Sequence, residues 1–165
     1  MAGPHTLAET ERAVQTRLAG MDLDFEAMAI VSNLFRAANA VRNHLEGSVL
    51  RPHDLTWTAF VVLWVTWIWE PIETRQIANE GGFSRATLSG VLTTLEGRGF
   101  VQRERSDTDG RLVLVRLTPA GRRLMKRLFP LFNDQERALV ASIPERRRAE
   151  AADRLRMLTI TANGG

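Results

Sequence analysis

The stretch PIETRQIANEGGFSRATLSGVLTTLEGRGF, residues 71–100, predicts two short helices joined by a glycine turn. Thr74 can cap the first helix, Gly81 and Gly82 make the turn, and Ser84 can cap the second helix. The second helix has one apolar face at helical spacing, made of Leu88, Val91, Leu92 and Leu95. Its other face carries small or hydroxylated residues instead of Glu and Lys, which indicates that something approaches this face closely.

A β-hairpin is predicted directly afterwards, in QRERSDTDGRLVLVRLT at residues 102–118. Two short helices followed by a hairpin form the winged version of the helix-turn-helix. In that fold the second helix lies in the major groove of DNA and the hairpin tip reaches the minor groove, whose negative potential attracts arginine. Arg111 is then the residue at the tip. Asp109 supports it by bracing the guanidinium or by shaping the turn.

Two further helices are predicted before residue 71. Residues 22–50 show the apolar spacing of an amphipathic helix, and Thr56 can cap a second helix that ends at Glu70-Pro71. This second helix is apolar nearly all round, so it should be central. Two tryptophans near its end are interpreted as packing residues, namely Trp67 and Trp69.

Helices also follow the hairpin. Thr118 can cap one of them, with Pro119 in its first turn, and another is predicted after Pro144. These helices have no obvious partner inside a small winged core, so a self-complementary interface in a homodimer is the economical explanation. The expected fold class is mainly α (α+β), a winged helix-turn-helix in one chain of residues 1–165, with dimerisation helices at 22–55 and 118–160 and a DNA-binding lobe at 56–117.

Composition and charge agree with a soluble domain that has a polyanionic partner. The chain has 165 residues, of which 44% are apolar and 25% are charged. Residues 83–127 hold ten Lys and Arg against four Asp and Glu, whereas residues 1–82 hold six against ten. Such a local surplus favours binding to phosphates, because Lys and Arg that neutralise them release counterions. A solvated charged face is the alternative explanation.

Other classes of protein fit the sequence less well. The chain has no cysteine, and its three histidines stand in unrelated contexts at His5, His44 and His53. No nucleophile is paired with a base and no glycine loop suits a phosphate, so no enzyme, cofactor or metal site is predicted. The N-terminus lacks the pattern of a signal peptide, and no apolar run is long enough to cross a bilayer. A cytoplasmic protein without a membrane partner is therefore expected.

The order of these parts is similar to that of a known family. The chain resembles the MarR family of bacterial winged-helix transcriptional regulators over residues 22–160, and the resemblance rests on LTWTAFVVL, PIETRQIANEGGFSRATLSGVLTTLEGRGFVQRE, DTDGRLVLVRLT and TPAGRRL. It implies a symmetric homodimer on roughly palindromic double-stranded DNA, with half-sites about 34 Å apart. Such a dimer is expected to act as a repressor, because it blocks polymerase sterically on a promoter, and activation is the alternative.

The resemblance also assigns DNA contacts by position. Arg111 becomes the minor-groove residue, Arg103 and Arg105 become phosphate neutralisers, and Arg75 is a further phosphate contact. The recognition helix supplies the remaining contacts, which are Ser84, Arg85, Thr87, Ser89, Thr93 and Thr94.

Three glycines depart from the family pattern. Gly90 stands where many relatives carry an arginine that reaches base edges, so discrimination has to come from Arg85, from hydroxyl groups or from DNA shape. Gly81 replaces an apolar residue and should loosen the preceding helix. Gly110 occupies a position that is often a second arginine of the wing.

Many members of the family release DNA when a small aromatic or phenolic acid binds between the dimer helices and the winged lobe. Trp57, Phe60 and Trp64 share the second helix and can line such a crevice, while His44 and Arg42 can meet an anionic group. Ordinary core packing of these aromatic residues is the alternative explanation.

A winged helix that binds protein instead of DNA is the alternative function, because this fold also serves as an adaptor. The basic hairpin separates the two hypotheses, since an adaptor does not need it. Charge reversal at Arg111 should abolish DNA affinity under the first hypothesis and have little effect under the second.

Overall fold

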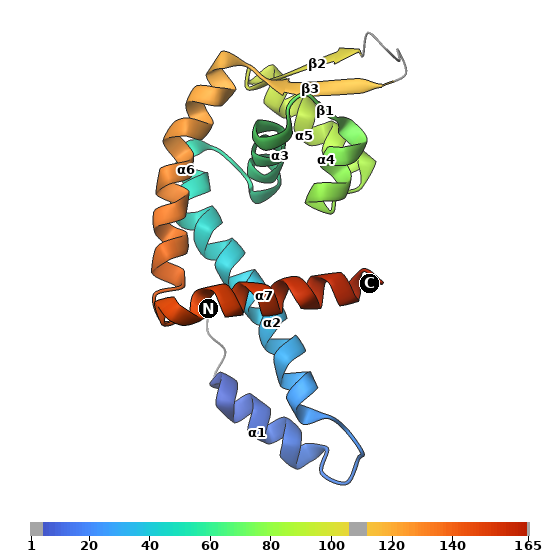
Figure 1. Ribbon diagram of the computed structural model, residues 1–165, viewed down its shortest axis with the longest axis vertical. Helices are drawn as coiled ribbons and strands as arrows, with labels where there is room; N and C mark the ends of the chain where they lie inside the picture. The colour runs from blue at the N-terminus through green and yellow to red at the C-terminus, as the bar shows by residue number, and fades with distance from the viewer. Residues whose placement is uncertain (1–4, 106–111, 165) are drawn as a thin grey trace. The chain divides into compact units, whose positions relative to one another are not determined.

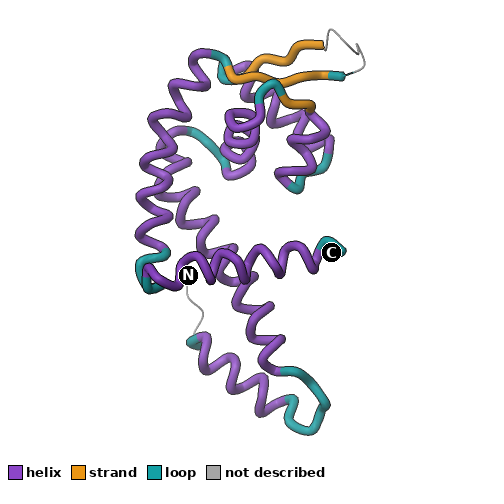
Figure 2. The backbone as a smooth tube through the Cα atoms, viewed as in Figure 1, coloured by secondary structure: helices purple, strands orange, loops and turns teal. Residues whose placement is uncertain are grey.

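The computed structural model of the chain describes residues 5–105 and 112–164. The chain divides into two compact units, Met1–Asn43 and His44–Gly165. Figure 2 shows that most of the described chain is helical and that the strands are short. The predicted fold class, mainly α with a small β component, is therefore confirmed. None of the described helices is both long and apolar enough to span a membrane.

The first unit contains α1 (Leu7–Arg17) and nearly all of α2 (Phe25–Leu45). Glu9 Oε2 accepts a hydrogen bond from the Thr6 amide at 2.7 Å, and the Thr6 hydroxyl accepts one from the Glu9 amide. This capping box starts α1, a helix that was not among those predicted. Its signal is present as Thr and Glu three residues apart. Asn33 Nδ2 of α2 donates to Glu11 Oε1 of α1 at 2.7 Å, which ties the two helices together.

The second unit begins at His44, next to the end of α2. A π-helical turn at Glu46–Leu50 leads into a 3-10 turn at Arg51–His53. Helix α3 (Trp57–Trp69) follows, and Thr56 Oγ1 accepts a hydrogen bond from the Ala59 amide at 3.2 Å. The prediction that Thr56 caps this helix is confirmed.

The helix-turn-helix consists of α4 (Thr74–Gly81) and α5 (Arg85–Gly97). Ser84 caps α5 as predicted, because its hydroxyl accepts a hydrogen bond from the Thr87 amide at 3.1 Å. The prediction that Thr74 caps α4 is wrong. Glu73 occupies the cap position and forms a capping box with Gln76, so Thr74 is already the first helical residue.

Two glycines allow the turn between these helices. Gly82 ends α4 with a φ of 65°, in the left-handed region that favours glycine. A Cβ atom on Gly81 would lie 2.3 Å from the ring of Phe83, so the missing side chain makes room for that ring. Helix α4 continues through Gly81.

The predicted hairpin consists of β2 (Val101–Arg105) and β3 (Val113–Leu117), paired antiparallel with Val101 opposite Leu117. A third strand that was not predicted, β1 (Ile72–Glu73), pairs with the other edge of β3, with Ile72 opposite Val115. The strand order is β1-β3-β2. Two residues are too few to show an alternating pattern, which explains why the sequence did not indicate β1.

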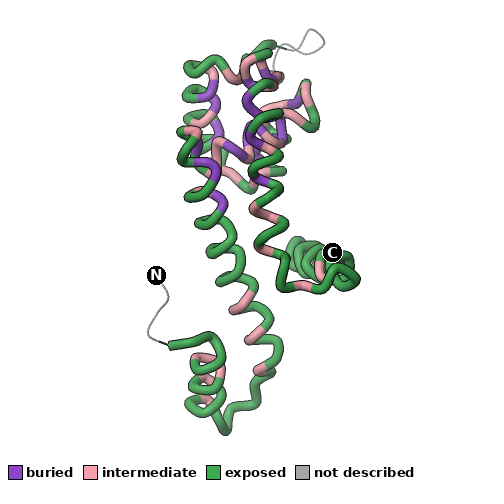
Figure 3. Tube along the Cα trace, turned by 90° about the vertical axis from the view of Figure 1, so that its left-hand side faces the viewer, coloured by how far each residue is buried: buried purple, intermediate pink, exposed green. Residues whose placement is uncertain are grey.

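The hydrophobic core lies in the second unit, where the segment 45–55, helices α3, α4 and α5, the three strands and α6 all contribute buried residues. Figure 1 shows α3, α4 and α5 beneath the three strands, with α6 (Pro119–Leu139) leaving the end of β3. In Figure 3 the buried residues gather in this region. The most deeply buried side chains come from helices α3 to α6, from the strands β2 and β3 and from the segment before α3, and they include Leu50, Leu63, Ile77, Leu92, Leu117 and Met125.

Aromatic rings join α3 to α6. Trp64 stacks on Phe129 with ring centroids 4.5 Å apart, and Trp67 meets the same ring edge-on at 6.0 Å. The packing role predicted for Trp67 is therefore confirmed. The same role predicted for Trp69 is wrong, since 64% of its surface is exposed. Helix α3 leaves the core in its last turn, where the neighbouring Ile68 is exposed as well.

Helix α6 begins in close contact with the base of the wing. Thr118 caps it as predicted, because its hydroxyl accepts a hydrogen bond from the Gly121 amide at 3.0 Å. The Thr118 amide donates to the Phe100 carbonyl at 3.0 Å, so the helix start lies against the segment that precedes β2. A last helix, α7 (Glu145–Ala162), follows α6, and neither α1 nor α7, both described throughout, contains a buried residue.

Substitution of Gly121 tests the close contact between the start of α6 and the Phe100 carbonyl. A Cβ atom there would lie 2.1 Å from the Phe100 carbonyl oxygen, which is backbone and cannot turn away. We expect Gly121→Ala to lower the free energy of unfolding by about 1–3 kcal/mol, measured by urea denaturation. The control is Gly97→Ala, because nothing lies within 4 Å of a Cβ atom there and alanine favours helix. Equal stability of the two variants would contradict the tight contact.

Candidate nucleic-acid interface

The exposed face of α5 carries all the recognition-helix residues that the sequence singled out. All six are exposed: Ser84, Arg85, Thr87, Ser89, Thr93 and Thr94. The opposite face buries Leu88, Leu92 and Leu95 in the core, which fixes the direction in which the exposed face points. Nothing lies within 4 Å of a Cβ atom on Gly90, so the middle of this face is open space.

Several hydroxyl groups on this face are engaged within the helix itself. Ser84 Oγ lies 2.8 Å from Thr87 Oγ1 while it also caps the helix. Thr94 Oγ1 donates to the Gly90 carbonyl at 3.1 Å, which leaves its oxygen as an acceptor. Among the described side chains of α5, Arg85 is the one cation on this exposed face.

The structure brings three predicted phosphate or base contacts together around one hollow. Arg75 from α4, Arg85 from α5 and Arg103 from β2 line an open hollow of about 610 Å³. Ser89 contributes a hydroxyl group to the same wall. The hollow lies between the helix-turn-helix and the base of the wing, so arginines from three different elements contribute to its lining. The remaining lining residues are Glu73, Thr74, Leu88, Leu92, Leu112 and Val113.

Arg103 is paired with a carboxylate that the sequence prediction did not include. Its Nε donates to Glu96 Oε2 at 3.0 Å, its terminal nitrogen lies 2.5 Å from the same oxygen, and its amide donates to Glu96 Oε1 at 3.1 Å. The hydrogen bond from the Arg103 side chain lowers the pKa of Glu96 below its ordinary value. The pair joins the last turn of α5 to the first residues of the wing. Arg103 therefore holds position as well as carrying charge.

The other predicted wing residues divide into two groups. Arg105 is exposed at the end of β2. Arg111 and Asp109 lie outside the described residues, as does Gly110. Within the described part of the hairpin, Arg116 Nε donates to Glu104 Oε1 at 2.5 Å across the two strands, which fastens β2 to β3.

The residues predicted to bind an effector range from buried to exposed and have different neighbours. Phe60 is buried and stacks on Phe132 of α6 at 4.3 Å, and Trp57 lies 6.2 Å from the same ring. Trp64 also packs against α6. His44 Nε2 lies 2.8 Å from Gln135 Oε1. Arg42 belongs to the first unit and hydrogen-bonds with Asn39 there, and Trp57 and Trp64 are only partly buried.

Two carboxylates are the residues that sequence reasoning missed. Glu96 stands seven residues before Arg103 across the Gly97–Gly99 turn, and the opposite charges were the available signal. Glu70 was interpreted only as the end of α3, but its side chain reaches the end of β3 and the start of α6. No local pattern indicates that contact, because its partners are 47 and 52 residues away.

A capped recognition helix with an exposed polar face, a helix of eight residues before it and a basic hairpin after it define a winged helix-turn-helix protein. A model of the MarR family matches residues 55–113, the same segment. The HTH-type transcriptional regulator YwaE of Bacillus subtilis is 40% identical over 121 residues, which are 73% of this chain and 71% of that protein. The chain belongs to the MarR family of transcriptional regulators.

Solved structures share the fold. A probable transcriptional regulator from Pseudomonas aeruginosa aligns with a TM-score of 0.71 and 25% identity, over 78% of this chain and 96% of that one. Sco3205 from Streptomyces coelicolor, a MarR family transcriptional regulator in complex with DNA, aligns with a TM-score of 0.75 and 20% identity, over 84% of this chain and 89% of that one. The winged helix-turn-helix predicted from the sequence is confirmed.

The Glu96–Arg103 pair makes a pH-dependent prediction. Because the pKa of Glu96 is lowered in the folded protein, the pair stabilises the fold above the ordinary value of 4.5 and loses this effect as the pH falls through the lower folded value. Both side chains are about one-third exposed. We expect Glu96→Gln to lower the free energy of unfolding by about 0.5–1 kcal/mol at neutral pH.

The measurement is urea denaturation of wild type and variant at neutral pH and at about pH 3.5, where the difference should shrink. Glu80→Gln, at an exposed position of α4, is the control for loss of a carboxylate. A difference of the same size at both pH values would contradict the ion pair as its cause.

Proposed function

We propose that this protein is a homodimeric, sequence-specific DNA-binding repressor. The observation that carries the proposal is the exposed face of α5, which is small and hydroxylated around Gly90 and leads into a hollow lined by three arginines. A face without long side chains suits close approach to base edges in a major groove, and the arginines suit the flanking phosphates. Membership of the MarR family supports the same function.

Each residue has a proposed role in the complex. Arg85 reads a base edge, with Ser89, Thr93 and Thr94 as hydroxyl contacts beside it. Arg75 and Arg105 neutralise phosphates, and Arg103 does so from a position that Glu96 fixes. Arg111 enters the minor groove, with Asp109 as its support. Ser84 and Thr87 contribute mainly by starting the helix, because the Thr87 amide is already hydrogen-bonded to the Ser84 hydroxyl.

Apolar residues on exposed helices support the homodimer. Phe35 of α2 is 67% exposed, and Ile30 and Val31 of the same helix are exposed as well. In α7 the exposed apolar residues are Leu155, Met157, Leu158 and Ile160. Exposed apolar residues gathered on one helix mark an interaction surface, and a second copy of the chain is the partner that a symmetric DNA-binding protein requires.

Release of DNA by a small aromatic or phenolic acid is a further part of the proposal. Trp57 and Trp64 are partly buried beside the phenylalanines of α6, so flat aromatic surface is available next to the winged lobe. Among the proteins with a similar fold, PcaV of Streptomyces coelicolor is in complex with its natural ligand and BpsR of Bordetella bronchiseptica is regulated by 6-hydroxynicotinic acid. His44 is the proposed partner for the acid group, and Arg42 is a second candidate.

Selection from a random duplex pool by the purified protein tests DNA recognition. We expect one palindromic motif, whose affinity falls steeply as salt rises. Arg85→Ala should weaken binding to the selected site by about 1–3 kcal/mol and relax its sequence preference, measured by fluorescence anisotropy. Arg111→Ala should weaken binding and reduce the salt dependence.

The matched control is Arg137→Ala, which removes an exposed arginine near the C-terminal end of α6. It should leave the affinity within about twofold of wild type, since screening is strong between distant exposed charges. Weak binding without any motif, equally insensitive to all three substitutions, would favour the protein-binding adaptor instead.

Charge at the exposed apolar face tests the homodimer. Phe35→Glu should shift the protein from dimer to monomer in sedimentation equilibrium, because a carboxylate buried in an apolar interface lacks a partner. Ala37→Glu places the same charge two residues further on, about 200° round the helix, and should retain the dimer. A dimer of equal stability in both variants would show that this face lies outside the interface.

A further inference from the structure

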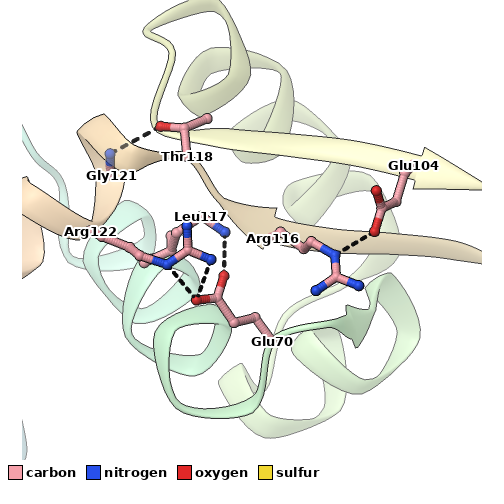
Figure 4. Close-up of polar contacts among 7 residues, drawn as sticks. All are labelled: Glu70, Glu104, Arg116, Leu117, Thr118, Gly121 and Arg122. Atoms are coloured by element: carbon pink, nitrogen blue, oxygen red, sulfur yellow. Dashed lines mark hydrogen bonds and ion pairs between the residues drawn. The ribbon is translucent and has the colours of Figure 1, made fainter.

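The Glu70 carboxylate lies where the end of α3, the end of β3 and the start of α6 meet. It follows α3, and its side chain is only 15% exposed. One oxygen, Oε2, accepts a hydrogen bond from the Leu117 amide at 2.6 Å. The other oxygen, Oε1, accepts from Arg122 Nε at 2.9 Å and lies 2.8 Å from a terminal nitrogen of the same guanidinium. Figure 4 shows this carboxylate between the end of β3 and the first turn of α6.

The hydrogen bond from the Leu117 amide to Glu70 extends the hydrogen-bonding pattern between β1 and β3. The register between β1 and β3 places Ile72 opposite Val115, so the position opposite Leu117 is residue 70. The chain leaves the strand before that point, and the Glu70 side chain supplies the acceptor that a backbone carbonyl would have provided. Leu117 is 1% exposed, so its amide would otherwise be buried without a partner.

The contact with Arg122 fixes the start of α6. Thr118 caps this helix one residue after β3, and Arg122 lies in its first turn on the side of Glu70. Helix α6 is the connection from the winged lobe to α7, which carries several exposed apolar residues. The angle between the lobe and α6 therefore depends on this junction together with the aromatic packing of α3 against α6.

We propose that Glu70 is a positioning residue for DNA binding, which holds the winged lobe at a fixed angle to α6 through Leu117 and Arg122. The proposal rests on the function proposed above. In a homodimer this angle determines how far apart the two α5 helices lie. The Glu70–Arg122 pair thus sets the preferred spacing between half-sites, although neither residue belongs to the exposed face of α5.

The preferred spacing between half-sites is measured with three duplexes. One is the palindrome selected by wild type, the second has one base pair added at its centre, and the third has one base pair removed there. The quantity of interest is the ratio of affinities between the selected spacing and the altered ones. A uniform change in charge affects all three duplexes alike, so it cancels in this ratio. A duplex with a single half-site reports whether the lobe itself still binds DNA.

The variants separate the two contacts of Glu70. Glu70→Gln keeps an acceptor for the Leu117 amide but removes the ion pair, and Arg122→Leu removes the pair from the other side at a position that is 41% exposed. Arg123→Leu is the matched control, since it removes a cation from the next residue, which is exposed. Thermal unfolding followed by circular dichroism confirms that each variant is folded.

We expect Glu70→Gln and Arg122→Leu each to reduce the spacing ratio by about two- to thirtyfold while single half-site affinity is retained. The double variant should be no worse than either single variant, because both remove one shared contact. Arg123→Leu should keep the wild-type ratio. An unchanged ratio in both folded variants, with wild type selective for one spacing, overturns the proposal. If wild type selects no palindrome, the proposed function itself fails, and that result is obtained from the wild type alone.

Discussion

Helix α3 carries no charged residue, and it is stable in water only when neighbouring elements cover it on several sides. Helices α4 and α5 pack against it on one side, β3 lies against it, and α6 covers it through stacked aromatic rings. Its buried residues Leu63 and Val62 are at the centre of the core. The recognition helix is therefore held in place by the same burial that stabilises the lobe.

The junction at residues 117–122 connects this core to the rest of the second unit. Three contacts converge there: the Thr118 cap, the close approach of Gly121 to the Phe100 carbonyl and the Glu70 carboxylate. The cap marks where α6 starts, the glycine allows its close approach to the segment before β2, and the carboxylate links it to the end of α3. A short, rigid junction of this kind lets a small lobe hold a defined orientation.

Local signals were sufficient to predict most of the fold. Thr56, Ser84 and Thr118 cap their helices because capping depends on a hydroxyl group and an amide two or three residues away. The same logic placed the cap of α4 one residue too late, since Glu73 can accept the same hydrogen bond. Helix α1 was missed although its capping box was present, and β1 was missed because pairing with β3 alone makes it a strand.

The exposure of the candidate residues on α5 was predictable from the sequence, but the carboxylate partners of the arginines were not. Exposure of the six residues on α5 follows from helical periodicity, which the sequence contains. The carboxylate partners of Arg103 and Arg122 are separated from them in the sequence by a turn or by most of the winged lobe. The pairs with Glu96 and Glu70 are therefore visible only in the three-dimensional structure. The exposure of Trp69 could not be predicted from the sequence for the same reason, because the neighbouring elements decide which residues of α3 are covered.

The basic surplus of residues 83–127 is only partly available to phosphates. Arg103, Arg116 and Arg122 are each within hydrogen-bonding distance of a glutamate, which cancels part of their field. Salt dependence reflects the phosphates actually neutralised, so it should be smaller than a count of arginines suggests. These pairs instead hold β2 to α5, β2 to β3 and α6 to α3. Since phosphate contacts carry no sequence information, arginines that fix geometry serve specificity more directly than arginines that only add charge.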